Sequence, residues 1–304
     1  MLSLSARRSF TRRDGLKLAF AALLPGRVRS RASDSTPMPD LAQRIPPRAP
    51  DALTGSRFAQ SVIGADRHER ERAIQDQLLS GNLPDFLRKL APISFRHRLA
   101  NGATVAATIF VMPEYLAIGS DRDFLRIPMN LYTARAVADR FNCVLPTKKI
   151  VDAIYAESAH RLTPQPLPAG PQMTSTGYYR THNSMIDRQS EERGIREGGL
   201  VAGHKKDVVL TNLLARRPSQ IAIYGWHRGV GVPIQPLSTV HGAGYADYSH
   251  GIRLVSHVMI VGEERRSILD VLQDPMLANI LSDEGSLQPV LEAWAKGWVK
   301  PAAA

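Results

Sequence analysis

The spacing of apolar side chains along the chain predicts helices in the first half, strands through much of the second half, and a final helix. Residues 66–90 show helical spacing in two pieces, interrupted at Gly81, a residue type that breaks helices. Apolar residues recur at the same spacing over 131–141, and a further run follows Thr147, a residue type that caps helix N-termini. The last helical stripe covers 287–298.

Strands are predicted where β-branched and apolar residues run together between Gly, Pro and Ser. These runs cover 103–112, 115–119, 207–214, 220–226 and 252–262. Four prolines within 163–171 predict a stiff, extended connection at the surface. Helices and strands come in blocks rather than as alternating βα units, which predicts an α+β fold. The expected order is N-terminal helices, a central, mostly antiparallel sheet and a C-terminal helix.

Three segments of different composition divide the chain of 304 residues. Residues 1–32 are basic, and residues 33–57 are rich in Pro, Ser, Asp and Arg without a period, which is typical of a flexible linker. Residues 58–304 show no internal repeat and are expected to form a single α+β domain. No uncharged apolar run approaches roughly 18 residues, so no membrane span is expected.

The positive charge of the chain is concentrated at its N-terminus. The formal net charge is +11, and residues 1–32 carry eight of the 39 Lys and Arg residues against Asp14 alone. A nucleic-acid-binding domain needs basic residues clustered on the folded part of the chain. The charge distribution therefore disfavours a nucleic acid as partner.

The basic segment has the three-part order of an export signal: basic residues, the apolar stretch LKLAFAALL (16–24), then small and polar residues. The stretch Thr11-Arg12-Arg13-Asp14-Gly15-Leu16-Lys17 resembles the twin-arginine translocation (Tat) signal of bacteria, although that family usually has a large apolar residue where Gly15 stands. The resemblance implies a signal peptide over 1–32, the Tat machinery as partner, and export of the folded protein to the periplasm or beyond. A disordered basic tail on a cytosolic protein is the alternative.

The rest of the chain gives a weaker resemblance. The segments VMPEYLAIGSDRDF, AGHKKDVVL and ADYSHGIRLV are similar to parts of exported bacterial proteins of unassigned function, which implies no activity. One cysteine excludes a disulfide framework within the chain and a Cys-based zinc cluster. The chain also lacks the G-x-S-x-G, H-E-x-x-H, P-loop, Rossmann and EF-hand motifs. These absences disfavour the enzyme classes that use them.

Histidines supply the candidate chemistry, because six of the nine lie between 182 and 257. Several follow predicted strands or lie in glycine-rich loops, where a rigid sheet positions catalytic groups. The candidate catalytic residues are His204, His227, Asp247 and His250.

The segment from His241 to His250 is the densest candidate. If its glycines let it fold back, His241, Asp247 and His250 would converge, and such a set suits a divalent metal such as zinc. The same groups could form a metal-free acid–base pair. A polar turn with structural hydrogen bonds is the third alternative.

A second hypothesis uses Cys143. It precedes the helix predicted after Thr147, where the helix dipole can lower the pKa of a thiol. With His204 before a later strand, the order resembles papain-like cysteine hydrolases, although the family's motif around the cysteine is missing. A buried, unreactive cysteine is the alternative. Tyr178, Tyr179 and the pair His182-Asn183 are expected to line a cleft edge or a surface loop.

These observations favour an exported hydrolase with a His/Asp-based, metal-dependent or metal-free site. Its expected substrate, from location alone, is a cell-envelope or extracellular polymer. The alternatives are a non-catalytic periplasmic protein that binds a polymer or a small ligand, and a cysteine hydrolase using Cys143 and His204.

Overall fold

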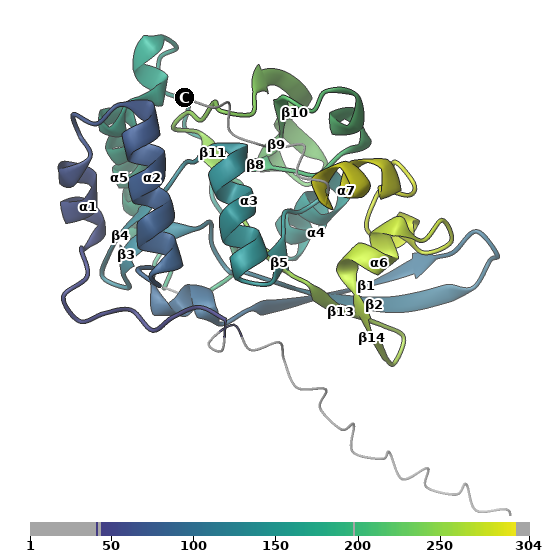
Figure 1. Cartoon of the computed structure of the whole chain (residues 1–304). Helices are drawn as coiled ribbons and strands as arrows, with labels where there is room; N and C mark the ends of the chain where they lie inside the picture. The colour runs from purple at the N-terminus through teal and green to yellow at the C-terminus, as the bar shows by residue number, and fades with distance from the viewer. Residues whose placement is uncertain (1–40, 42–43, 197, 296–304) are drawn as a thin grey trace, which may run out of the picture. The chain divides into compact units, whose positions relative to one another are not determined.

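Helices and strands follow one another in blocks along the chain (Figure 1). The computed structural model describes residues 41, 44–196 and 198–295. The predicted signal peptide and the start of the predicted linker lie outside the described residues. The helices are α1 (Gly55–Ser61), α2 (Arg67–Leu79), α3 (Leu131–Arg140), α4 (Lys148–Glu157), α5 (Thr176–Glu192), α6 (Ile268–Gln273) and α7 (Gln288–Ala295).

Side-chain caps fix where most of these helices begin. Asp66, Asn130 and Thr147 each accept a hydrogen bond from a backbone N–H three residues further on, at the starts of α2, α3 and α4. Such a bond satisfies one of the backbone donors that a helix N-terminus leaves free. The cap predicted at Thr147 is therefore confirmed. The break at Gly81 is confirmed too, because α2 ends at Leu79.

The larger sheet has six strands. Strands β1 and β2 pair antiparallel over their whole length. The opposite edge of β2 pairs with β13 and β12, and the strand order is β14-β13-β2-β12-β5. The bounds are β1 (Ala91–Arg98), β2 (Thr104–Val111), β5 (Cys143–Val144), β12 (Val255–Ser256), β13 (Val258–Val261) and β14 (Glu264–Ser267).

A second sheet of four strands has the order β10-β9-β8-β11. Its strands are β8 (Lys206–Val208), β9 (Gln220–Gly229), β10 (Val232–Gly242) and β11 (His250–Gly251). β11 runs parallel to β8 and places His250 opposite Lys206, whereas the other pairs are antiparallel. Two smaller pairs complete the fold: the hairpin of β3 (Ala117–Ser120) and β4 (Asp123–Arg126), and the parallel pair of β6 (His160–Arg161) and β7 (Val201–Ala202).

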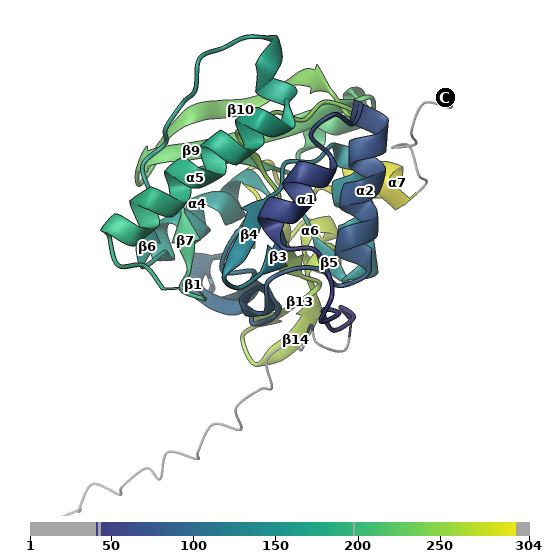
Figure 2. The ribbon, with the colours of Figure 1, turned by 90° about the vertical axis from the view of Figure 1, so that its left-hand side faces the viewer.

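The elements pack around one main hydrophobic core. Helix α4 contacts both β9 and β1, so it lies between the two larger sheets. Helix α2 packs against α3, while α1 packs against α5 and the β3–β4 hairpin. Figure 2 shows α5 on the side turned to the viewer, with α1 beside it. The predicted α+β fold, with its helices at both ends of the described chain and mostly antiparallel sheets, is confirmed.

Several segments differ from what the sequence pattern predicted. The strand predicted over 207–214 ends at Val208, and a 3-10 helix follows over Asn212–Arg216. Helix α5 stands where a surface loop was one of the two expectations, because Ser175 caps it and buried side chains recur at helical spacing at Tyr179, His182 and Ile186. Residues 44–57, predicted as linker, pack onto the fold. Arg48 donates hydrogen bonds to the backbone oxygens of Gly119 and Ala52, at 3.1 and 2.7 Å.

Within the described ranges, no helix has the length and apolarity needed to cross a membrane.

Candidate functional site

A polar cavity of about 380 Å³ opens between α1, the β3–β4 hairpin, α5 and the residues 195–196 and 198–201. Two buried charged residues, Glu114 and Arg126, contribute to its lining. Helix α5 contributes a polar stripe that includes Arg180, Asn183 and Asp187. These positions are three and four residues apart, so they share one face of the helix.

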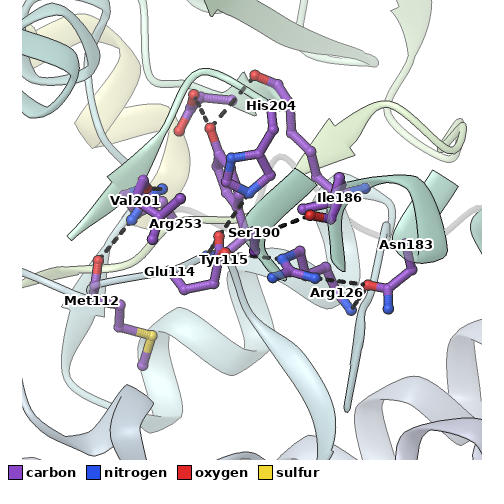
Figure 3. A network of polar contacts seen from close by, with 12 residues as sticks. Met112, Glu114, Tyr115, Arg126, Asn183, Ile186, Ser190, Val201, His204 and Arg253 are labelled. Carbon is purple, nitrogen blue, oxygen red and sulfur yellow. Dashed lines mark hydrogen bonds and ion pairs between the residues drawn. The ribbon is translucent and has the colours of Figure 1, made fainter. Parts of the chain in front are cut away.

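Glu114 forms the centre of the hydrogen-bond network drawn in Figure 3. Its carboxylate lies 2.9 Å from His204 Nε2 and 2.9 Å from Arg126 Nε, and it accepts a further bond from the backbone N–H of Tyr115 at 2.7 Å. Burial opposes its ionisation, but the positive charge near His204 and the guanidinium of Arg126 outweigh burial and lower the pKa of Glu114 below its usual range. Glu114 is therefore an ionised carboxylate beside the cavity.

Arg126 connects Glu114 to α5. Its Nη1 donates to Asp187 Oδ1 at 2.6 Å and to Asn183 Oδ1 at 3.2 Å. Its Nη2 has no hydrogen-bond partner among the residues that the structure describes. The Nη2 amino group of a buried guanidinium thus remains free for a ligand.

His204 contacts Glu114 but does not line the cavity, and residues next to it have positive φ angles. Gly203 before it has φ +99°, and a Cβ there would lie 2.5 Å from the backbone oxygen of Leu162. Trp226 donates from Nε1 to the His204 carbonyl at 3.1 Å, and Trp226 itself has φ +56°, which is strained for a bulky residue. Strain of this kind persists only where surrounding contacts enforce it, and it is frequent at functional sites.

The imidazole of His204 is buried and oriented by the carboxylate. Burial lowers its pKa, although Glu114 works in the opposite direction. With Nε2 bonded to Glu114, His204 Nδ1 has no partner within the described ranges. An Nε2–H group donating to Glu114 is the arrangement that fits this contact.

Further titratable groups lie next to His204 in the interior. Lys205 donates from Nζ to the Tyr248 carbonyl at 2.7 Å and lies 3.5 Å from His182 Nδ1, and no carboxylate of the described residues forms an ion pair with it. Burial lowers the pKa of Lys205 to about 7 and that of His182 to about 2. The Tyr115 hydroxyl donates to Asp207 at 2.8 Å. This inner cluster, defined as His182, Lys205, Asp207, Asp247 and His250, contributes nothing to the cavity lining.

The predicted convergence of His241, Asp247 and His250 is present in part. Asp247 and His250 approach to 3.8 Å, and both are buried. His241 stacks on Tyr245 with ring centroids 4.2 Å apart, and its centroid lies 6.4 Å from that of His250. Among the described residues, no three His, Cys, Asp or Glu side chains are grouped to hold a metal ion.

Asp247 is bonded instead to its own turn. It accepts hydrogen bonds from Ser249 Oγ at 2.5 Å and Ser249 N–H at 2.8 Å. Burial lowers the pKa of His250 to about 4, and neither of its ring nitrogens has a hydrogen-bond partner in the described chain.

His227 belongs to a separate polar group on β9. Its Nε2 lies 3.0 Å from Asp152, which also accepts from the Tyr224 hydroxyl at 2.7 Å and from Lys148 Nζ at 2.8 Å. The ring stacks on Tyr155 at a centroid distance of 4.7 Å. None of these side chains lines the polar cavity, so the four predicted catalytic residues are divided among different places.

Cys143 lines a smaller, largely apolar cavity of about 180 Å³ together with His257 and Trp294. Its thiol is buried, and burial raises the pKa of Cys143 to about 12. Its contact is with the Phe141 carbonyl, whereas His204 is bonded to Glu114. The Cys143–His204 hypothesis gains no support from this geometry.

Sequence reasoning missed Glu114, Arg126 and Asp187, and it named Asn183 only within the pair expected at a cleft edge or in a surface loop. Glu114 and Arg126 each adjoin a short apolar run, and neither position carries a motif. The polar stripe of α5 did leave a signal, because Arg180, Ser184 and Asp187 recur at helical spacing. No protein-family model, curated protein or solved structure matches this chain.

Proposed function

We propose that this chain is a hydrolase whose reacting groups are Glu114 and Arg126 in the polar cavity. One observation carries the proposal: an ionised carboxylate and a guanidinium with an unused N–H group lie side by side in a cavity of about 380 Å³. This volume accommodates a small molecule or a short stretch of a polymer.

The proposed reaction is attack of water on an acyl group. Glu114 takes a proton from water while the water oxygen bonds to the substrate carbonyl carbon. Arg126 Nη2 donates to the oxyanion that forms. Glu114 then returns the proton to the leaving group as the bond from carbon to that group breaks, and the carboxylate is restored. His204 acts as a positioning residue, because it holds Glu114 and does not line the cavity.

A specific observation favours a second candidate, a non-catalytic binding protein. Three donors already hold the Glu114 carboxylate, and its lowered pKa makes it a weak base. A binding protein would use the same ion pairs only to shape and charge the cavity.

Location is part of the proposal and rests on the leader sequence. The pair Arg12-Arg13 before an apolar stretch supports export by the Tat route, with an envelope or extracellular polymer as substrate. Replacing both arginines with Lys should retain the protein in the cytoplasm, since the Tat receptor reads the guanidinium pair. Normal export of that variant would exclude the Tat route.

The mechanism proposed here needs no metal ion. A zinc-type ion on His241, Asp247 and His250 stays a prediction, and metal analysis of the purified protein tests it. A stoichiometric ion that is lost in Asp247→Asn would assign the metal to that segment.

Glu114→Gln tests the choice between hydrolase and binding protein. It keeps the volume but removes the base, so hydrolysis of isolated envelope polymers should fall by roughly 10² to 10⁴-fold. Asp152→Asn is the matched control, because it alters a carboxylate paired with a histidine outside the cavity. Full turnover in Glu114→Gln would overturn the proposed mechanism. A loss confined to Asp152→Asn would move the site to His227.

A further inference from the structure

The smaller cavity beside Cys143 is separate from the polar cavity, and the two share none of their described lining residues. We refer to it as the apolar cavity. Its volume is about 180 Å³, and α3, β5, α6 and α7 all contribute to its walls. Apolar side chains make up most of the lining: Val144, Leu145, Leu210, Leu269, Leu291 and Trp294. An apolar space of about 150 Å³ holds one benzene molecule, so this one has room for a single ring.

A space of this kind favours an apolar occupant over water. Water needs several polar partners to enter a cavity, and the leucines that line this one offer none. An empty space also lowers the stability of a fold, because the side chains around it lose packing contacts. A molecule that fills the space restores those contacts and stabilises the folded protein.

Trp294 gives the apolar cavity an aromatic wall that is held from outside. The Arg135 guanidinium lies over the indole ring, 5.1 Å from its centroid, and Arg135 does not line the cavity. Arg135 is held in turn by Asp139, at 3.3 Å. Two aromatic rings attract each other in edge-to-face or offset arrangements. An aromatic ligand therefore gains more from this wall than an alkyl ligand of the same volume.

A single polar edge is built into the lining by Asn142. Its φ is +54°, a conformation that Asn adopts more readily than most residues, and its carbonyl accepts the His257 N–H at 3.1 Å. The side-chain amide of Asn142 makes no hydrogen bond with another described residue. An amide both donates and accepts, and so does a hydroxyl group. A ligand with one hydroxyl group would find its partner here.

Charge at the apolar cavity is already compensated. Asp139 is the one Asp, Glu, Lys or Arg among the described lining residues, and it is paired with Arg135. A charged ligand would leave water for a place without a free counter-ion, which is unfavourable. The lining therefore favours a neutral ligand.

From this arrangement we infer that the apolar cavity binds a neutral aromatic compound with one ring and one hydroxyl group, of the phenol class. The ring packs among the leucines and against Trp294, and the hydroxyl group pairs with the Asn142 amide. The site is independent of the hydrolysis proposed for the polar cavity, so either can fail without the other.

Calorimetric titration of the full chain with phenol tests the inference. Phenol should bind saturably, and cyclohexanol roughly two- to tenfold more weakly because it lacks the aromatic ring. Leu269→Trp fills the cavity from a half-buried position and should weaken phenol binding at least tenfold. Leu213→Trp is the matched control, because Leu213 is 43% exposed and outside the lining, and it should leave phenol binding unchanged.

Asn142→Gly tests the polar edge separately. Glycine adopts the positive φ of this position freely, so the variant removes the amide and keeps the backbone. Phenol binding should weaken roughly fivefold, the effect of one hydrogen bond, whereas binding of toluene should stay unchanged.

Four results would overturn the inference. Absence of saturable phenol binding would show that the cavity is not a site, and unchanged phenol binding in Leu269→Trp would place the phenol elsewhere. Equal binding of cyclohexanol and phenol would show that the aromatic ring is not selected. Equal losses of phenol and toluene binding in Asn142→Gly would show that the amide is not the partner of the hydroxyl group.

Discussion

The buried charges of this protein are held in two contrasting ways. In the cavity, Glu114 and Asp187 both pair with Arg126, at 2.9 and 2.6 Å. In the inner cluster, Lys205 contacts a carbonyl and an imidazole but no carboxylate, and the nitrogens of His250 have no partner within the described chain. Adjacent residues, His204 and Lys205, connect the two regions.

The contrast determines which groups stay charged. Pairing keeps Glu114 ionised, whereas burial lowers the pKa of Lys205 to about 7 and, despite Asp247 at 3.8 Å, that of His250 to about 4. A buried pair holds its charges in place, while an unpaired buried cation favours its neutral form. Charge for a ligand is therefore available in the cavity, and the inner cluster mainly affects stability.

The largest expected effect comes from breaking the paired region. Arg126→Met leaves the buried carboxylate of Glu114 and the partly exposed carboxylate of Asp187 without their guanidinium, and should lower the free energy of unfolding by about 3–5 kcal/mol. Chemical denaturation measures the loss. Arg266→Met is the control, because it removes an exposed ion pair with Glu264 and should cost less than about 1 kcal/mol. Equal losses of stability in the two variants would show that the buried ion pair of Arg126 contributes no more than an exposed one.

The pH dependence of the free energy of unfolding tests the effect of burying Lys205 without a paired carboxylate. Its pKa is about 7 in the folded protein against an ordinary value of 10.5. Between these values the unfolded chain holds a proton that the folded chain lacks, so this group makes the free energy of unfolding rise with pH from about 7 toward 10. Below pH 7 both states are charged, and the full penalty of burying the charge applies.

Lys205→Met should remove this dependence. We expect the variant to be more stable at neutral pH, by an amount on the order of a few kcal/mol, and its stability to change less between pH 7 and 10. Burial also lowers the pKa of Lys206, so part of the slope should remain. Lys89→Met, at an exposed position, is the control and should leave the slope unchanged. If Lys205→Met kept the pH dependence of stability of the original protein, burial of an unpaired Lys205 would not be its cause.

The sequence predicted the elements better than the site, for a physical reason. Helical spacing and the cap at Thr147 act within a few residues, so α3 and α4 could be predicted from local pattern. The pairing of Glu114 with Arg126 depends on how the β3–β4 hairpin returns the chain toward Glu114. No local pattern encodes that return. Helix α5 was missed because most of its buried positions hold polar residue types, among them His182, Asn183 and Gln189, so no apolar stripe marks the helix.

The histidines show the same limit. They cluster in the sequence, and the prediction that they form one site assumed that sequence proximity means spatial proximity. His227 instead faces α4 through Asp152, whereas His204 is bonded to Glu114. Asp247 and His250 did come together, because they are the first and last residues of a four-residue turn, in which the His250 N–H donates to the Asp247 carbonyl at 3.1 Å.

The smallest expected effect separates the two possible roles of Asp247, reactive or structural. Asp247→Asn keeps one acceptor oxygen for Ser249 but loses the charge, so we expect roughly 1–2 kcal/mol less stability. Turnover per folded molecule should be unchanged, since Asp247 does not line the cavity. Ser249→Ala, which removes the 2.5 Å hydrogen bond from the other side, should produce a similar loss. The opposite pattern, an unchanged melting temperature with turnover reduced roughly 10²-fold, would make Asp247 and His250 the reactive pair and leave the cavity as the binding region.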